Sequence, residues 1–197
     1  GFKSFDHLGN NGKGDGFRDY PAQTQINVAN RWNYEVHDGL CSQTLINYTH
    51  EDRLGGQMSF TKDMKGSDSI YGLGGTVDRV HFFTKNGAPI GNTSSFGTQL
   101  SATYFKQDAF YGLSNYEGVE TDVYANALVN TMVRGGHNVD FGASFRYTDL
   151  EENLYSTPYI GANQFISNLQ EGDLRANFIK EEIVPGVFGQ FNFIDDK

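Results

Sequence analysis

Two neighbouring stretches of the chain, Val119–Val133 and His137–Asp149, alternate apolar and polar residues and are separated by three residues. Side chains of a β-strand point alternately to its two sides, so this alternation predicts two strands, each with one apolar and one polar face. The apolar positions are Val119, Thr121, Val123, Ala125, Ala127, Val129 and Thr131 in the first stretch, and Val139, Phe141, Ala143, Phe145 and Tyr147 in the second. The acidic residues on the opposite face, Glu120, Asp122 and Asp140, are expected to line a polar interior.

The spacing of these stretches fits a hairpin. If Val133 pairs with His137, the loop is 134–136 and the apolar positions of both strands lie on one face. Three-residue hairpin loops often end on a residue in the left-handed region, which Gly136 adopts without Cβ strain. A second hairpin, around the turn 37–39, follows the same rule with even-numbered positions, and Gly39 closes its turn. Its apolar positions are Thr24, Ile26, Val28, Trp32 and Tyr34 before the turn, and Leu40, Thr44, Ile46 and Tyr48 after it.

The predicted strands are longer than those of most globular proteins. A globular strand usually has about five or six residues, whereas about nine to eleven residues cross a bilayer in a barrel. Aromatic residues lie where the two edges of a bilayer would be, with Trp32 and Tyr34 just before a turn and Tyr48 and Tyr147 well beyond one. Amphipathic rings collect at both edges of a membrane. The pattern therefore predicts an all-β fold in which these strands form the wall of an antiparallel transmembrane β-barrel.

Along the whole chain the pattern predicts seven strands, over 22–36, 40–51, 75–85, 95–107, 119–133, 137–151 and 184–194, with residues 1–5 ending an earlier one. Alternation is weakest at 75–85. Long connections (8–21, 52–74, 108–118, 152–183) alternate with shorter ones (37–39, 86–94, 134–136), as in outer-membrane barrels with long extracellular loops and short periplasmic turns. Seven or eight strands in an open sheet would expose two unpaired edges, which lipid does not tolerate, so we expect a piece of a larger barrel.

Composition and charge narrow the function classes. A net charge of −9 argues against nucleic acid as a partner. The mean hydropathy is −0.51, and no run approaches the roughly eighteen apolar residues of a helical membrane anchor. Cys41 is the single cysteine, so neither a disulfide framework nor a cysteine metal cluster is expected. Motifs for nucleophilic catalysis, zinc hydrolysis and phosphate binding are absent from the sequence, so we expect no enzyme, no catalytic residues and no cofactor.

Several segments carry a family resemblance: Gly14–Pro21, Asn30–Tyr34, Glu51–Gln57 and Ile183–Phe188, with Gln107–Leu113 at the end of a predicted strand. Through them residues 1–197 resemble the β-barrel of TonB-dependent outer-membrane receptors of the Bacteroidetes type. The resemblance implies a barrel of about 22 strands in a Gram-negative outer membrane. This chain would supply about seven or eight of the strands, with the plug domain and the C-terminal strands absent.

The resemblance also implies a function and partners. These receptors are transporters that import a bulky, scarce nutrient, of the siderophore, cobalamin, haem or glycan class. The implied partners are outer-membrane lipid, an extracellular small-molecule or glycan ligand, and TonB, which would act through the missing N-terminal region. The substrate and the ligand-binding residues do not follow from the resemblance.

Two short motifs have a ligand-binding and a structural interpretation. Asn11, Lys13 and Asp15 have the spacing of a calcium loop, but a lysine at a ligand position opposes cation binding, so a glycine-rich turn is favoured. The segment Glu51-Asp52-Arg53, where a predicted strand leaves the membrane, either contacts a polar ligand or forms a local ion pair. We favour the ion pair, which would add about 0–1 kcal/mol of stability.

The histidines and the longest predicted loop leave alternatives open. A haem site requires an axial histidine in an extracellular loop or the plug, and His7 and His50 are the candidates, whereas His37 and His137 belong at solvated turns. The aromatic and amide residues of 152–183 either grip a bulky nutrient or pack the loop against its neighbours. These residues are Tyr155, Tyr159, Phe165 and Phe178, with Asn163, Gln164, Asn168 and Gln170.

Two other functions are compatible with the same pattern. The first is a complete, small eight-stranded outer-membrane barrel with a structural or adhesion role. The second is a soluble β-sandwich that binds glycans, whose apolar faces would meet in a core instead of facing lipid. Localisation separates the sandwich from the membrane barrels.

Overall fold

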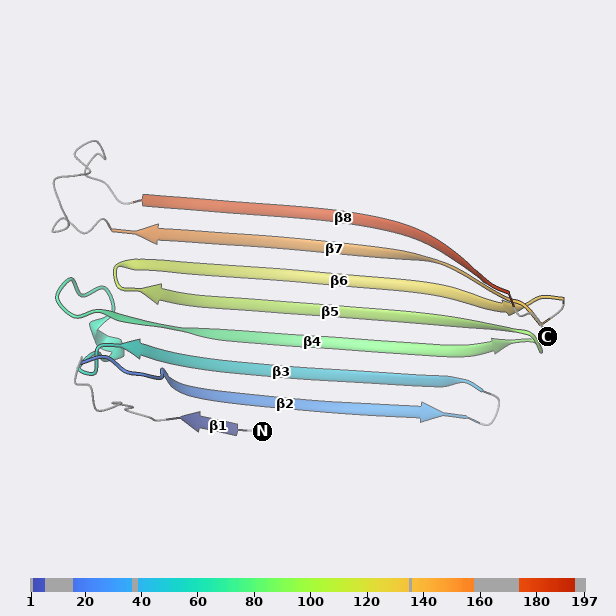
Figure 1. Cartoon of the computed structure of the whole chain (residues 1–197), viewed down its shortest axis with the longest axis horizontal. Helices are drawn as coiled ribbons and strands as arrows, with labels where there is room; N and C mark the ends of the chain where they lie inside the picture. The colour runs from blue at the N-terminus through green and yellow to red at the C-terminus, as the bar shows by residue number, and fades with distance from the viewer. Residues whose placement is uncertain (1, 6–15, 37–38, 135, 158–173, 194–197) are drawn as a thin grey trace.

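The structure, a computed structural model, describes residues 2–5, 16–36, 39–134, 136–157 and 174–193. Eight strands form one sheet in chain order, and every neighbouring pair is antiparallel (Figure 1). The strands are β1 (Phe2–Phe5), β2 (Ala22–Glu35), β3 (Cys41–Gly56), β4 (Gly72–Ile90), β5 (Ser94–Tyr111), β6 (Ser114–Met132), β7 (Asn138–Ser156) and β8 (Leu174–Asn192), with one 3₁₀ turn, η1 (Lys62–Met64). No helix in these ranges has the length and apolarity needed to cross a membrane. The prediction of an all-β antiparallel fold is confirmed.

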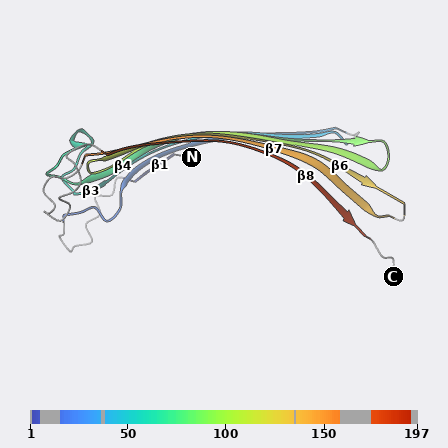
Figure 2. The ribbon, with the colours of Figure 1, turned by 90° about the horizontal axis from the view of Figure 1, so that it is seen from above.

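The sheet is a single curved layer. Figure 2 shows it edge-on: the strands overlie one another over much of their length and fan apart toward one end, where β8 bends furthest. Each strand pairs with its neighbours in the chain, so β1 and β8 are the two edges of an open sheet. The sheet is not closed into a barrel, and its place in a larger barrel stays a prediction.

Both predicted hairpins have the expected register. The backbone N–H of Val36 donates to the carbonyl of Leu40 (3.0 Å), and that of Val133 donates to His137 (2.8 Å). Gly39 closes the first turn at φ 78° and Gly136 the second at φ 79°, the left-handed region that glycine enters without strain. The three-residue loops and the glycine positions are therefore confirmed.

The strands run further than their apolar segments, and this corrects several predicted connections. The predicted long connection 108–118 is wrong, because β5 continues to Tyr111 and β6 begins at Ser114, leaving the turn 112–113. The connections 52–74, 86–94 and 152–183 are also shorter than predicted, at 57–71, 91–93 and 157–173. Outside the apolar segment the backbone ladder continues through polar positions, such as Asp108 opposite Glu117, so alternation fades before the strand ends.

The register joins the two hairpins into one apolar face. Along one row, Ile46 pairs with Phe82, Phe82 with Ala102, Ala102 with Val123 and Val123 with Tyr147. The strand with the weakest predicted alternation, β4, thus contributes Val80 and Phe82 to this face. We call it the apolar face, and the opposite side of the sheet the polar face.

The most buried residues lie at one end of the sheet. Among the described residues, the buried apolar side chains are Phe60, Ala109 and Phe110. Phe60, 1% exposed, comes from the β3–β4 loop and packs 5.8 Å from the Phe110 ring and against Gly72, where a Cβ would clash with it. The loop thus covers the end of the sheet, whereas most of the apolar face is surface. A sheet with this much exposed apolar area requires a covering partner.

Candidate functional site: the polar face of the sheet

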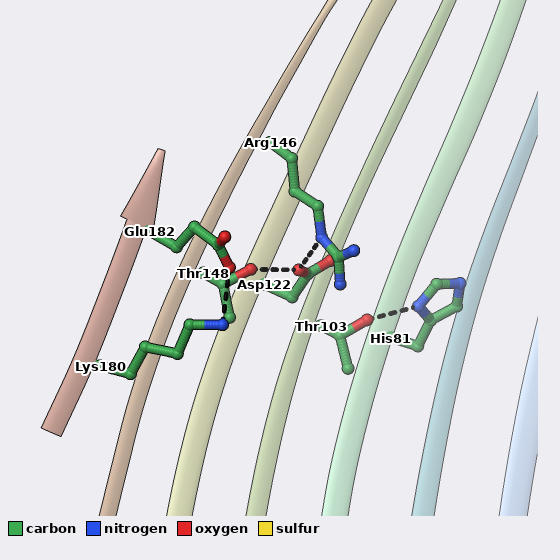
Figure 3. A network of polar contacts seen from close by, with 7 residues as sticks. All are labelled: His81, Thr103, Asp122, Arg146, Thr148, Lys180 and Glu182. Carbon is green, nitrogen blue, oxygen red and sulfur yellow. Dashed lines mark hydrogen bonds and ion pairs between the residues drawn. The ribbon is translucent and has the colours of Figure 1, made fainter. Parts of the chain in front are cut away.

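A row of polar side chains crosses five strands on the polar face. His81 pairs with Thr103, Thr103 with Asp122, Asp122 with Thr148, and Thr148 with Glu182. Figure 3 shows these residues on one side of the sheet, with Arg146 and Lys180 reaching toward the row. Because each member comes from a different strand, the row depends on four registers being correct together.

Hydrogen bonds and ion pairs connect neighbouring members of the row. Asp122 Oδ2 accepts from Arg146 Nε at 2.7 Å and from Thr148 Oγ1 at 2.9 Å, and His81 Nδ1 lies 2.9 Å from Thr103 Oγ1 (Figure 3). The Asp122 side chain is 21% exposed and that of Arg146 is 56% exposed. Ion pairs this close to solvent contribute roughly 0–1 kcal/mol. The row therefore makes the face hydrophilic and adds little stability.

A second row, nearer the short turns, consists of amides, a hydroxyl and one amine. Gln43 Nε2 donates to Asn33 Oδ1 at 2.9 Å, and the buried Oδ1 of Asn126 has no hydrogen-bond partner. The row runs through Asn33, Gln43, Lys85, Gln99, Asn126 and Ser144. The amides and the hydroxyl both donate and accept, and the Lys85 ammonium donates, which suits a wall that faces water or a polar ligand.

Near the short turns, glycines leave a depression in the polar face. A cavity of about 360 Å³ lies over Gly87 and Gly97, with Lys85 and Gln99 in its lining. Cys41 is exposed on this face, as its odd number predicts, and its Sγ is 2.9 Å from where a Cβ on Gly87 would be. A larger residue at Gly87 would therefore meet the cysteine.

A second hollow, of about 320 Å³, lies at the opposite end of the polar face. Its lining includes Glu51, Arg53, Gln107 and Tyr111. Glu51 forms an ion pair with Arg53, and the neighbouring Asp52 forms one with Lys62 of η1. These contacts agree with the local ion-pair interpretation of this segment.

Tyr116 lies near the same end of the polar face. Its hydroxyl donates to Glu152 Oε1 at 2.6 Å. This hydrogen bond, followed by partial burial and the charge of Glu152, raises the pKa of Tyr116 to about 12. The bond favours the neutral phenol because only the protonated hydroxyl can donate to a carboxylate.

The structure keeps the three described histidines, His50, His81 and His137, apart. His50 Nδ1 lies 2.8 Å from Asp78 Oδ1, and the His137 ring stacks on Phe193 at 4.5 Å. His81 belongs to the polar row, and His7 and His37 lie outside the described residues. No group of three metal-ligating side chains occurs in the part of the chain that the structure describes.

The other candidate residues are only partly described. Tyr155 lies in β7, with the Arg175 guanidinium 5.3 Å from its ring centroid, and Phe178 lies in β8. These two residues therefore belong to strands and not to the predicted loop. The calcium-loop positions Asn11, Lys13 and Asp15 lie outside the described residues, as do Tyr159 and Phe165.

Sequence reasoning placed Asp122 and Asp140 on the polar face but missed the row to which Asp122 belongs. The offset of β4 from β6 is set by the turns 91–93 and 112–113, and Gly91 (φ 64°) and Gly112 (φ 59°) are the local signals that could have located them. Correct placement of these two turns would have aligned His81 with Asp122.

Comparison with known proteins gives no match: no family model fits the chain, and no curated protein or solved structure matches it. The resemblance to TonB-dependent receptors therefore stays a prediction that rests on the chain's own segments.

Proposed function

We propose that the chain forms part of the barrel wall of a TonB-dependent transporter in a Gram-negative outer membrane, which imports a bulky, scarce nutrient. The observation that carries the proposal is the apolar face, which continues over the long strands β2–β8. The opposite face carries the two polar rows, alongside a few apolar side chains such as Phe83 and Phe188. In a membrane barrel, outward residues contact lipid and inward residues contact the lumen. The proposal assigns the chain no catalysis and no bound cofactor.

Aromatic residues at two levels of the apolar face support a membrane-crossing zone. Near the short turns lie Trp32, Phe96 and Phe141, and further along the strands lie Tyr48 and Tyr104, all of them exposed. Along β5, Phe96 and Tyr104 are separated by roughly 20 Å of membrane depth if the strand is tilted near 40°. This is comparable with the apolar band of about 25 Å in such barrels, whose edges carry aromatic girdles.

The two ends of the sheet fit the two sides of an outer membrane. The β2–β3, β4–β5 and β6–β7 turns lie at one end, which would be periplasmic (Figure 1). The β3–β4 loop, anchored by the buried ring of Phe60, lies at the other end, which would be extracellular. The polar row around Asp122 would then face the lumen, and further strands would pair with the edges β1 and β8.

The remaining parts of the proposal rest on the resemblance. TonB would act through the N-terminal region of the complete receptor, and the nutrient would belong to the siderophore, cobalamin, haem or glycan class. Neither rival function has an observation in its favour. A sandwich requires a second layer over the apolar face, and a small closed barrel requires β8 to pair with β1; the described strands include neither arrangement.

Localisation of the full-length native chain tests the proposal. We expect the protein in the outer-membrane fraction, resistant to alkaline carbonate, and with a mobility in detergent gels that shifts on boiling, since folded barrels migrate differently from unfolded chains. A known porin and a soluble periplasmic protein serve as markers. Recovery of the folded chain in the soluble fraction would overturn the proposal and favour the sandwich.

A further inference from the structure

A hollow of about 450 Å³ lies where the β3–β4 loop meets the β5–β6 turn and the end of β7. This volume is within the usual range of small-molecule sites, roughly 300–1,000 Å³. Tyr71 and Tyr111 line it, 45% and 52% exposed. Two tyrosine side chains open to solvent beside a hollow offer an amphipathic surface to a ligand.

Tyr71 is held in a fixed position. Its backbone N–H donates to the side-chain Oε1 of Gln57 at 2.9 Å, and its carbonyl accepts from the backbone N–H of Gln57 at 2.9 Å. Its ring lies against Gly112, where a Cβ would be 3.2 Å from Cε2. A rigid ring loses little conformational entropy when a ligand covers its open side.

Hydroxyl groups surround the two rings. Tyr111 pairs with Ser114 and Ser114 with Ser156, and the two serine hydroxyls are hydrogen-bonded at 2.8 Å. Ser67 and Thr157 add further hydroxyls to the lining. Each hydroxyl can donate one hydrogen bond and accept two, so the set matches a ligand that is itself rich in hydroxyls.

The charge of the lining selects against anions. Of the described residues that line the hollow, Asp68 alone is charged, and it is exposed. A carboxylate, phosphate or anionic iron chelate would find no cation there and would meet the charge of Asp68. A neutral ligand meets neither disadvantage.

The described lining of the hollow combines two tyrosine rings with several hydroxyls and has no positively charged side chain. We infer that this hollow binds a neutral carbohydrate unit. The sugar ring stacks on Tyr71, and its hydroxyls bond to the serines and to Tyr111. The inference rests on the proposed function, which makes this end of the sheet extracellular, and it selects the glycan class among the candidate nutrients.

The test is calorimetric titration of the full-length, detergent-purified protein. The probes are maltohexaose, xylohexaose, cellohexaose and mannohexaose as neutral ligands, and hexagalacturonate and an anionic ferric catecholate chelate as charged ones. We expect at least one neutral oligosaccharide to bind, Tyr71→Ala to weaken its binding about tenfold, and Tyr71→Phe to stay within about threefold. Tyr20, 70% exposed and outside the hollow, provides the control variant Tyr20→Ala, which should bind as the native chain does.

The other outcomes overturn the inference. They are binding of the charged probes alone, no binding of any neutral probe, or neutral binding that Tyr71→Ala leaves unchanged. If the protein is found in the outer membrane but gives one of these results, the carbohydrate site is rejected and the transporter proposal stands. If the protein is recovered in the soluble fraction, the transporter proposal is rejected, whichever ligand the protein binds.

Discussion

The ring of Phe188 on β8 lies over Gly142, its cross-strand partner on β7, so that a Cβ on Gly142 would be 2.5 Å from Phe188 Cζ. That Cβ would also collide with the carbonyl oxygen of Ala127. Glycine is therefore required here by the close approach of a ring and a backbone, a use of glycine typical of curved sheets.

Gly142→Ala should destabilise the folded sheet by about 1–3 kcal/mol, because the ring and the backbone must both shift. Urea titration of the protein folded in lipid vesicles measures the effect. The matched control is Gly189→Ala on β8, where the nearest atom to a new Cβ is Asp140 O at 3.8 Å. Equal losses in the two variants would contradict the close packing of Phe188 on Gly142.

A second prediction tests the assignment of the two faces. Ala143 and Ser144 are consecutive residues of β7, and they point to the apolar and the polar face at the same depth. In the proposed barrel, Ala143→Arg places a cation against lipid near mid-membrane and should cost about 2–4 kcal/mol. Ser144→Arg, facing the lumen beside Gly186, should cost much less.

The same urea titration in vesicles compares these two arginine variants. Similar costs would mean that both sides of β7 meet the same environment. A larger cost for Ser144→Arg would invert the face assignment. Either result removes the main support for lipid contact.

A third prediction concerns the ion pair between Asp122 and Arg146. A double-mutant cycle with alanine at both positions should give a coupling of about 0.2–1 kcal/mol, since both side chains reach solvent. The coupling should fall when salt is raised to about 1 M, where the Debye length is about 3 Å. The neutral hydroxyl pair Ser114–Ser156 is the control, and its coupling should not change with salt. A coupling of several kcal/mol would show that the pair is shielded from water.

Local patterns in the sequence predicted a large part of this fold. The turn glycines Gly39 and Gly136 and the parity of the flanking residues fixed two registers, since a slip of one residue would move every apolar side chain to the other face. The turn at 112–113 was missed because Asp108 and Glu117, a few positions before and after it, interrupt the apolar alternation and made the whole segment resemble a loop.

The site was harder to predict than the fold. The row from His81 to Glu182 depends on four registers at once, so an error in the predicted position of one turn is enough to misalign it. The hollow beside Tyr71 depends on a loop that folds back, and Phe60, which anchors this loop, stands alone between Ser59 and Thr61 in the sequence. Periodicity carries no information about such an isolated residue.

The last prediction concerns Tyr116, which lies in β6 beyond the level of Tyr104 and thus outside the proposed membrane-crossing zone. Its pKa is raised to about 12 by its hydrogen bond to Glu152, whereas an unfolded chain has the ordinary tyrosine value near 10. Below pH 10 the phenol is neutral in both states, and the hydrogen bond contributes its full stabilisation. Between pH 10 and about 12 the unfolded state releases the proton first, so this contribution falls as the pH rises and is lost above about 12.

Ultraviolet titration of phenolate absorbance in the folded protein measures this pKa. The chain has 11 tyrosines, so the signal of Tyr116 is obtained as the difference between the native chain and Tyr116→Phe. Glu152→Gln should return the pKa of Tyr116 toward 10, because a neutral amide stabilises the phenol over the phenolate far less than a carboxylate does. A difference curve centred near pH 10 in the native chain would show that the hydrogen bond does not form. A curve centred near 12 that Glu152→Gln leaves unchanged would assign the shift to burial instead.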